Sequence, residues 1–292
     1  MHYSERVKGI ILAGGNGTRL WPLTVSISKQ LLPVYDKPLI YYPLSTLMLA
    51  GIREILIITK PEDLSNFQKL LANSKSWGID ISFATQDKPR GIAEAFLIGA
   101  KFIGTDSVCL ILGDNIFFGP GLGNNLEKLK IEEKAIIFSY GVADPERYGV
   151  IETDKDGIVI SIEEKPKFPK SNSVIPGLYF YPNSVTEIAR RLNPSNRGEL
   201  EITDINLEYM KSYNLICKHL GRGTVWFDTG TFNSLSDASN FIRTVEMRQG
   251  IKVNVPEEVA FIKGFKSPDE LIALIKTYPL NEYRTYLESI VI

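Results

Sequence analysis

Short, continuously apolar segments alternate with segments of helical periodicity along the first third of the chain. The apolar segments are 7–13, 55–58, 81–84 and 108–112. Apolar residues at consecutive positions need cover on both faces of a strand, which is typical of a parallel sheet between layers of helices. Apolar residues recur at helical spacing over 41–51, 64–71 and 92–100. The alternation predicts an α/β fold with three layers and a mostly parallel sheet.

The pattern changes in the second half of the chain. Further strands are expected over 135–141, 150–153, 158–162 and 178–181, with a hairpin turn at Asp154–Gly157. After Thr231 the chain is expected to be helical, with one apolar face formed by Leu235, Ala238, Phe241, Ile242 and Val245. Because no repeat or low-complexity linker interrupts the chain, we expect a catalytic core over 1–232 and a helical extension, 233–292, packed on the same domain.

Composition excludes several classes of protein. The charges nearly balance, with 33 Lys+Arg against 34 Asp+Glu, which argues against a nucleic-acid partner. Cys109 and Cys217 are expected to be free thiols, and two histidines leave little room for His-based catalysis or zinc sites. No apolar run approaches the roughly 20 residues that span a bilayer. We therefore expect a cytoplasmic protein with no membrane partner.

A glycine-rich loop, Gly14-Gly15-Asn16-Gly17-Thr18-Arg19-Leu20, follows the first predicted strand. Glycines let the backbone approach a ligand and expose N–H donors to phosphate oxygens. The loop is not a Walker A motif, because Thr18-Arg19 follows Gly17. It is not a dinucleotide fingerprint either, because Leu20 replaces the third glycine and Lys60 stands where an acid is expected. A turn without a ligand remains an alternative on these residues alone.

Arg19 and Lys29 are candidate catalytic cations. Two phosphate-bearing ligands bound side by side would repel each other, since two like charges about 4 Å apart cost about 4 kcal/mol at an effective dielectric of 20. A site that joins them needs fixed cations and usually a metal. Taken singly, each of the two residues could also be an ordinary surface charge.

The ordered set of motifs makes the resemblance specific. The glycine loop, Ser28-Lys29-Gln30-Leu31-Leu32-Pro33 and Lys37-Pro38 resemble the signature of the sugar-nucleotide pyrophosphorylases. The likeness extends from about Lys8 to about Gly264 and is nearest to the enzymes of that family that use dTTP and glucose 1-phosphate. It implies a Rossmann-like nucleotidyltransferase fold with a mixed sheet, transfer of a thymidylyl group with release of pyrophosphate, and a homotetramer. Products of this kind serve deoxysugar synthesis, such as that of dTDP-rhamnose, for surface polysaccharides.

Two aspartates each follow an apolar segment, in Leu112-Gly113-Asp114-Asn115 and Trp226-Phe227-Asp228-Thr229. Carboxylates are hard oxygen ligands, and two of them together with substrate phosphates are a usual way of holding Mg²⁺. A lone Asp after a strand is more often a cap or a turn residue. The resemblance nevertheless implies Mg²⁺ as cofactor, with Asp114 and Asp228 as its ligands.

The resemblance also implies the substrate-binding residues. The nucleotide would be bound by Leu12, Gly14, Gly15, Gly17, Thr18, Arg19, Lys29, Gln86 and Gly91. The sugar phosphate would be bound by Asn115, Tyr148, Gly149, Glu164, Lys165, Ile175 and Arg197. The catalytic set would be Arg19, Lys29, Asp114, Lys165 and Asp228. Gln86 carries both a donor and an acceptor, so it could pair with the edge of thymine or uracil, although on its own it is an ordinary loop residue.

Three positions depart from the family pattern, namely Pro120, Phe232 and Ile262. In the family they lie toward a second, regulatory nucleotide-sugar site, so the departures leave catalysis untouched but put feedback by an end product in doubt. A UTP-using uridylyltransferase, a non-catalytic nucleotide-sugar sensor and a dinucleotide-dependent oxidoreductase remain alternatives. Leu20 and Lys60 argue against the oxidoreductase, and the retained aspartates and cations argue against the sensor.

Overall fold

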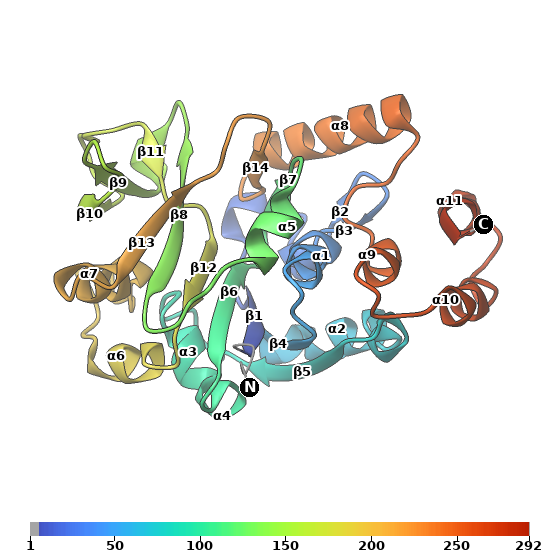
Figure 1. Cartoon of the computed structure of the whole chain (residues 1–292), viewed down its shortest axis with the longest axis horizontal. Coiled ribbons are helices and arrows are strands. Elements are labelled where there is room, and N and C mark those ends of the chain that lie inside the picture. The colour runs from blue at the N-terminus through green and yellow to red at the C-terminus, as the bar shows by residue number, and fades with distance from the viewer. Residues whose placement is uncertain (1–5, 292) are drawn as a thin grey trace.

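A mixed ten-stranded sheet forms the middle layer of the computed structural model, which describes residues 6–291 (Figure 1). The strand order is β10-β9-β11-β8-β12-β6-β1-β4-β5, and β13 pairs with β8. The first strands of this sheet are β1 (Val7–Ala13), β4 (Glu54–Thr59), β5 (Asp80–Thr85) and β6 (Ser107–Leu112). The later ones are β8 (Ala135–Gly141), β9 (Gly149–Thr153), β10 (Val159–Glu164), β11 (Ser173–Val174), β12 (Leu178–Tyr181) and β13 (Leu215–His219).

Parallel pairing is concentrated in the N-terminal half of this sheet. β1 pairs in parallel with β4 and β6, and β4 pairs in parallel with β5. β13 runs parallel to β8, whereas β9, β10, β11 and β12 pair antiparallel. The predicted α/β fold with a mixed sheet is confirmed, but the parallel pairing expected for most of the sheet prevails only in its N-terminal half.

Helices cover both faces of the sheet, which explains the continuously apolar strands. The neighbours Ile10 and Ile11 in β1 point to opposite faces, yet both are fully buried, each in a different hydrophobic cluster. One cluster includes residues of α1 (Tyr41–Leu49), α2 (Leu64–Leu70) and α5 (Leu122–Glu127). The other includes residues of α3 (Glu94–Ile98), α4 (Ala100–Ile103), α6 (Val185–Arg191) and α7 (Ile202–Lys211).

The single helix predicted over 92–100 is instead two short helices, α3 and α4, which meet at Gly99. A Cβ on Gly99 would lie 2.8 Å from the Cδ1 atom of Ile10 in β1. The glycine therefore lets the helical segment lie close to the sheet. It also weakens the helix, because glycine is a poor helix former.

The C-terminal helices share the core of the rest of the chain. α8 (Phe232–Gln249) buries Ala238 and Ile242 completely, whereas Leu235, Phe241 and Val245 are only partly buried. α9 (Pro256–Ile262), α10 (Pro268–Ile275) and α11 (Glu282–Val291) add side chains to the cluster that contains α1. The division into 1–232 and 233–292 stays a prediction. Within residues 6–291, no helix has the length and apolar character needed to cross a membrane.

Two short antiparallel ribbons complete the fold, β2 (Pro33–Val34) with β3 (Lys37–Pro38) and β7 (Asn115–Phe118) with β14 (Val225–Asp228). In the second ribbon Asp228 is the direct partner of Asn115. Asp114 lies immediately between β6 and β7. The ribbon therefore brings together two aspartates that are far apart in the sequence.

Candidate active site

The carboxyl ends of β1 and β6 lie side by side. Leu12 and Leu112 are register partners, and the N–H of Gly113 donates to the carbonyl of Leu12 at 2.9 Å. The glycine loop leaves the end of β1, and Asp114 follows the end of β6. Ligands of open α/β sheets bind beyond these strand ends, so the glycine loop and Asp114 border the expected ligand site.

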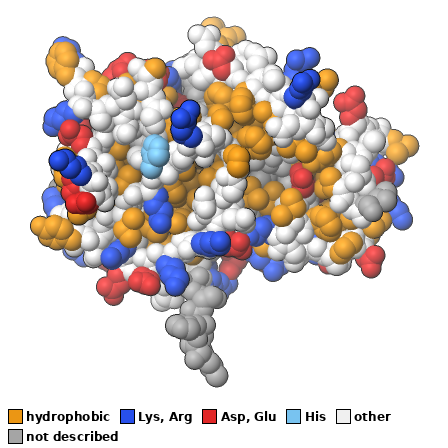
Figure 2. All heavy atoms as spheres, turned by 45° about the horizontal axis from the view of Figure 1, so that its top comes forward, with side chains coloured by type: hydrophobic (Ala, Val, Ile, Leu, Met, Phe, Trp, Pro, Cys, Tyr) orange, Lys and Arg blue, Asp and Glu red, His pale blue; other side chains and the backbone are white. Residues whose placement is uncertain are grey.

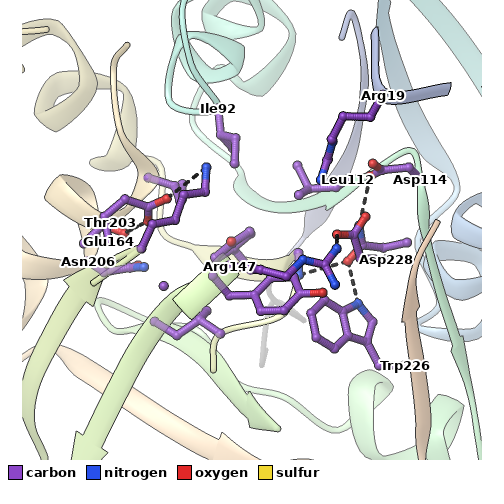
Figure 3. Close-up of a pocket in the computed structure, with 18 residues that line it drawn as sticks. Arg19, Ile92, Leu112, Asp114, Arg147, Glu164, Thr203, Asn206, Trp226 and Asp228 are labelled. Atoms are coloured by element: carbon purple, nitrogen blue, oxygen red, sulfur yellow. Dashed lines mark hydrogen bonds and ion pairs between the residues drawn. The ribbon is translucent and has the colours of Figure 1, made fainter. Parts of the chain in front are cut away.

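A cavity of about 380 Å³ opens at this place (Figure 3). It brings together predicted residues from across the chain, namely Arg19, Asp114, Asn115, Tyr148, Gly149, Glu164, Lys165, Ile175 and Asp228. Figure 3 shows Arg19, Asp114 and Asp228 at one end and Glu164 at the other. One end of the cavity thus holds two aspartates and Arg19, and the other end holds the Glu164 carboxylate, which could accept hydrogen bonds from a polar ligand.

Asp114 is paired with a cation. Its carboxylate forms an ion pair with the buried Lys29 ammonium and accepts a hydrogen bond from Asn115 Nδ2 at 2.9 Å. Burial by itself raises the pKa of Asp114, but the Lys29 ammonium and these hydrogen bonds outweigh burial and hold that pKa below its usual value. Asp114 is therefore a carboxylate at neutral pH.

Asp228 lies in a different electrostatic environment. Its Oδ1 accepts from the N–H of Gly230 at 2.9 Å, and its Oδ2 lies 3.5 Å from Arg147 Nη2. Burial and the neighbouring Asp114 carboxylate raise the pKa of Asp228 above its usual value, although Lys29, Arg19 and Arg147 act against them. Arg19 packs against the segment that follows Asp228, since a Cβ on Gly230 would lie 2.6 Å from Arg19 Nη2.

The two aspartates fit a divalent cation. They are close enough for the charge of Asp114 to raise the pKa of Asp228, and a bound cation would relieve that repulsion. Residues 6–291 contain no group of three or more His, Cys, Asp or Glu side chains that could hold a metal. The remaining ligands would therefore come from substrate phosphates and water, as is usual for Mg²⁺.

The other end of the cavity is built on β10. Glu164 Oε2 accepts from Thr203 Oγ1 of α7 at 2.6 Å, and Glu164 Oε1 lies 3.5 Å from Lys165 Nζ. Lys165 has a φ of 43°, in the left-handed region that L side chains seldom adopt. Its N–H donates to the carbonyl of Tyr148 at 3.0 Å. Strained backbone of this kind clusters at functional sites, where it fixes the direction of a side chain.

Asn115 lines the cavity, but its polar atoms are largely occupied. Its Oδ1 accepts from Trp226 Nε1 at 2.6 Å and from the N–H of Gly177 at 3.2 Å, while its Nδ2 donates to Asp114. Asn115 is therefore better placed to orient Asp114 than to form several bonds to a sugar.

The remaining predicted residues lie outside the lining of this cavity. They are Leu12, Gly14, Gly15, Gly17, Thr18, Lys29, Gln86, Gly91 and Arg197. Most of them belong to the loops that follow β1 and β5, next to the cavity. Arg197 is held elsewhere, because its guanidinium pairs with Glu199 at 2.6 Å and with Glu201 at 3.2 Å.

Comparison with known proteins agrees with this geometry. Residues 8–245 match the family model described as nucleotidyl transferase. The chain belongs to the nucleotidyl transferase family. It is 56% identical to a glucose-1-phosphate thymidylyltransferase of Mycolicibacterium smegmatis, over 96% of this chain and 98% of that protein. It is 53% identical to a protein of the same name from Xanthomonas campestris, over 97% of this chain and 96% of that protein.

Solved structures agree with the family. A Bacillus anthracis protein assigned as a glucose-1-phosphate thymidylyltransferase, in complex with sucrose, matches with a TM-score of 0.75 and 40% identity, over 81% of this chain and 95% of that one. A UDP-glucose pyrophosphorylase in complex with UDP-glucose is more distant, with 26% identity and a TM-score of 0.72, over 82% of this chain and 99% of that one. The predicted likeness to sugar-nucleotide pyrophosphorylases is confirmed, and the chain is a nucleotidyltransferase.

Sequence reasoning missed several residues that line the candidate site. Ile92, Leu112, Arg147, Gly177, Tyr179, Ile202, Thr203, Asn206 and Trp226 also line the cavity. Strand periodicity could have identified Trp226, because it lies two positions before Asp228 and therefore on the same face of β14. Helix periodicity offered another signal, because Thr203 and Asn206 are three positions apart on α7. No local sequence pattern indicated Arg147, because its contact with Asp228 forms only in the folded chain.

Proposed function

We propose that this nucleotidyltransferase transfers a thymidylyl group from dTTP to α-D-glucose 1-phosphate, giving dTDP-glucose and pyrophosphate. The observation that carries the proposal is the cavity itself, in which Asp114, Asp228 and Arg19 lie opposite Glu164. One end suits a charged triphosphate and its cation, and the other end suits the hydroxyl groups of a sugar. The names of the similar proteins support the choice of thymidine nucleotide and glucose.

In the proposed reaction an oxygen of the sugar 1-phosphate attacks the α-phosphorus of dTTP. A new P–O bond forms, the bond from the α-phosphorus to the oxygen that bridges to the β-phosphorus breaks, and pyrophosphate leaves with that electron pair. The attacking oxygen is already anionic, so no general base is needed, which agrees with a cavity lining that has no histidine. Arg19 and Lys29 would stabilise the charge of the triphosphate.

Asp114 and Asp228 would hold Mg²⁺, which neutralises phosphate charge when it is bound. Lys29 would then be released from its ion pair with Asp114 and could contact phosphate oxygens instead. We propose that Gln86 contacts the base and that the glycine loop, with Gly14, Gly15, Gly17 and Thr18, contacts the triphosphate.

At the sugar end, Glu164 would accept hydrogen bonds from sugar hydroxyls, and Lys165 would hold the sugar phosphate. Lys165 already lines the cavity, whereas Arg197 would first have to leave Glu199 and Glu201. Lys165 is therefore the stronger candidate for the first phosphate contact. Tyr148, Gly149 and Ile175 would complete the walls of the sugar pocket.

The test is a panel of five nucleoside triphosphates against several sugar 1-phosphates, with pyrophosphate release as the readout. We expect the highest kcat/KM for dTTP with glucose 1-phosphate. A clear preference for UTP would identify a uridylyltransferase instead. Binding of nucleotide-sugar without pyrophosphate release from any pair would identify a sensor.

We also propose a homotetramer. On the face shown in Figure 2, hydrophobic side chains form patches with charged groups around them. The partly buried Leu235, Phe241 and Val245 on α8, with Phe232 and Met247 exposed to 48% and 68%, could pack against a second copy. Ala238 and Ile242 cannot, because they are already buried within the chain. A monomeric mass by light scattering at micromolar concentration would reject the oligomer.

A further inference from the structure

The Gln86 side chain is held by a carboxylate. Gln86 follows β5 and is 3% exposed, and its Nε2 donates to Glu94 Oε2 at 2.7 Å. Glu94 is the first residue of α3 and is 6% exposed. Its other oxygen, Oε1, accepts from Arg90 Nε at 2.7 Å. The three side chains thus form a hydrogen-bonded chain, in which Arg90 and Gln86 both donate to the Glu94 carboxylate.

This chain selects one orientation of the Gln86 amide. A half-turn about its last bond exchanges the amide nitrogen and oxygen with almost no change in shape, so shape alone cannot set the orientation. A carboxylate only accepts hydrogen bonds. The reversed orientation would place Gln86 Oε1 against Glu94 Oε2, two buried acceptors without a proton between them, which is unfavourable. Glu94 therefore keeps the amide nitrogen on its own side.

The opposite side of the amide faces the glycine loop. A Cβ on Gly14 would lie 2.5 Å from Gln86 Oε1, so the amide oxygen lies directly over this glycine. Gly14 is the first residue of the loop that we propose to bind the nucleotide. The fixed orientation therefore presents an acceptor toward the expected place of the base, and one N–H of Nε2 remains beside it.

The backbone around Arg90 is also fixed. Leu200 donates its N–H to the carbonyl of Arg90 at 2.8 Å, and its own carbonyl accepts from Ala93 at 3.1 Å. Gly91 has a φ of +103°, and a Cβ there would collide with the backbone of Leu200. Gly91 thus allows a close approach that holds Arg90 and Glu94 in place, which is a structural reason for a glycine at this position.

We propose that Glu94 is a positioning residue for base recognition: by fixing the amide of Gln86 it selects thymine or uracil against cytosine. The proposal rests on the proposed function and on Gln86 as the base contact. Thymine and uracil carry a hydrogen on N3, which can donate to Gln86 Oε1, and O4, which can accept from the remaining N–H. Cytosine has an acceptor at N3 and a donor at C4, so it would match only the reversed amide that Glu94 disfavours.

The experiment compares wild type with Glu94→Leu, which has no acceptor, and with Glu94→Gln, whose amide oxygen can still accept. The readout is the ratio of kcat/KM for dTTP to that for dCTP, with the Kd of each nucleotide measured by calorimetry without sugar phosphate. We expect Glu94→Leu to lower both the kinetic ratio and the ratio of affinities by about 5- to 150-fold, the range for one buried polar mismatch. Glu94→Gln should keep most of the selectivity.

A merely structural role for Glu94 would lower activity with both nucleotides alike and leave the ratio unchanged. An unchanged ratio in Glu94→Leu, or an equal loss in Glu94→Gln, would overturn the proposal. In a Gln86→Ala background, Glu94→Leu should have no further effect on the ratio, and an additional loss there would also contradict it. Wild type is assayed first, because failure to release pyrophosphate from dTTP would refute the proposed function rather than the role of Glu94.

Discussion

Arg147 Nη2 lies 3.5 Å from Asp228 Oδ2, while Lys29 pairs with Asp114. Each of the two aspartates thus has its own cation, and these cations come from distant parts of the chain. A divalent ion held by both carboxylates would compete with the two cations. If the divalent ion displaced them, Arg147 and Lys29 would each lie next to the expected position of the triphosphate.

Replacing Arg147 with Gln should therefore tighten the binding of a divalent ion. Partly exposed ion pairs contribute about 0.2–1 kcal/mol, so we expect the Kd for Mn²⁺ without nucleotide to fall by up to about 5-fold. Manganese is used because its binding can be followed by electron paramagnetic resonance. Weaker or unchanged Mn²⁺ binding in Arg147→Gln would show that the pair does not compete with the metal.

Asp114→Asn and Asp228→Asn should each lower kcat by about 10²–10³-fold, the usual loss for one preorganised charge-stabilising contact. The amide keeps the shape of the side chain but loses the charge that holds a metal. Asp106→Asn is a matched control, because Asp106 pairs with Lys8 at 2.9 Å and does not line the cavity. Near-normal rates at limiting Mg²⁺ in either site variant would contradict the metal assignment.

Substitutions at the two ends of the cavity should affect kcat/KM for different substrates. Arg19→Ala should lower kcat/KM for dTTP much more than for glucose 1-phosphate, because Arg19 lies beside Asp228 and Gly230. Lys165→Ala should show the opposite bias, since Lys165 lies beside Glu164. Steady-state kinetics with each substrate varied in turn measures both. If both variants affected the two substrates alike, the division into a triphosphate end and a sugar end would be wrong.

β1, β4 and β6 could be predicted because they are largely buried on both faces and so have mostly apolar sequences. β1 is predicted to the residue, as Val7–Ala13. By contrast β13 went unnoticed, because Leu215, Ile216 and Cys217 are only partly buried and Lys218 and His219 are exposed. A short strand that is only partly buried, and that ends in exposed polar residues, is easily taken for a loop.

The lining of the cavity could be predicted where a residue belongs to a motif next to a strand end, as do Arg19 and Asp114. Arg147 could not, because it meets its partner Asp228, which is distant in the chain, only in the folded structure. Thr203 had its helical spacing to Asn206 as a signal, but its contact with Glu164, 39 positions away, is again set by the fold. Local sequence patterns do not indicate such contacts, because the contacts form only when the sheet and the ribbon pack together.

UTP should be a measurable second substrate. Thymine and uracil present the same O4 and N3–H edge to Gln86 and differ only by the methyl group at C5, so Gln86 cannot distinguish them. One methyl group in a hydrophobic pocket gives about 10- to 200-fold discrimination. UTP also carries a 2′-hydroxyl that dTTP lacks, so dUTP is the matched comparison. We therefore expect kcat/KM for dUTP to lie within that range below the value for dTTP, and Gln86→Ala to lower the values for dTTP, dUTP and UTP by a similar factor. The measurement is initial-rate pyrophosphate release with glucose 1-phosphate saturating. A change of more than about 10-fold in the ratio of kcat/KM for dTTP to that for dUTP in Gln86→Ala would mean that this side chain also senses the methyl group.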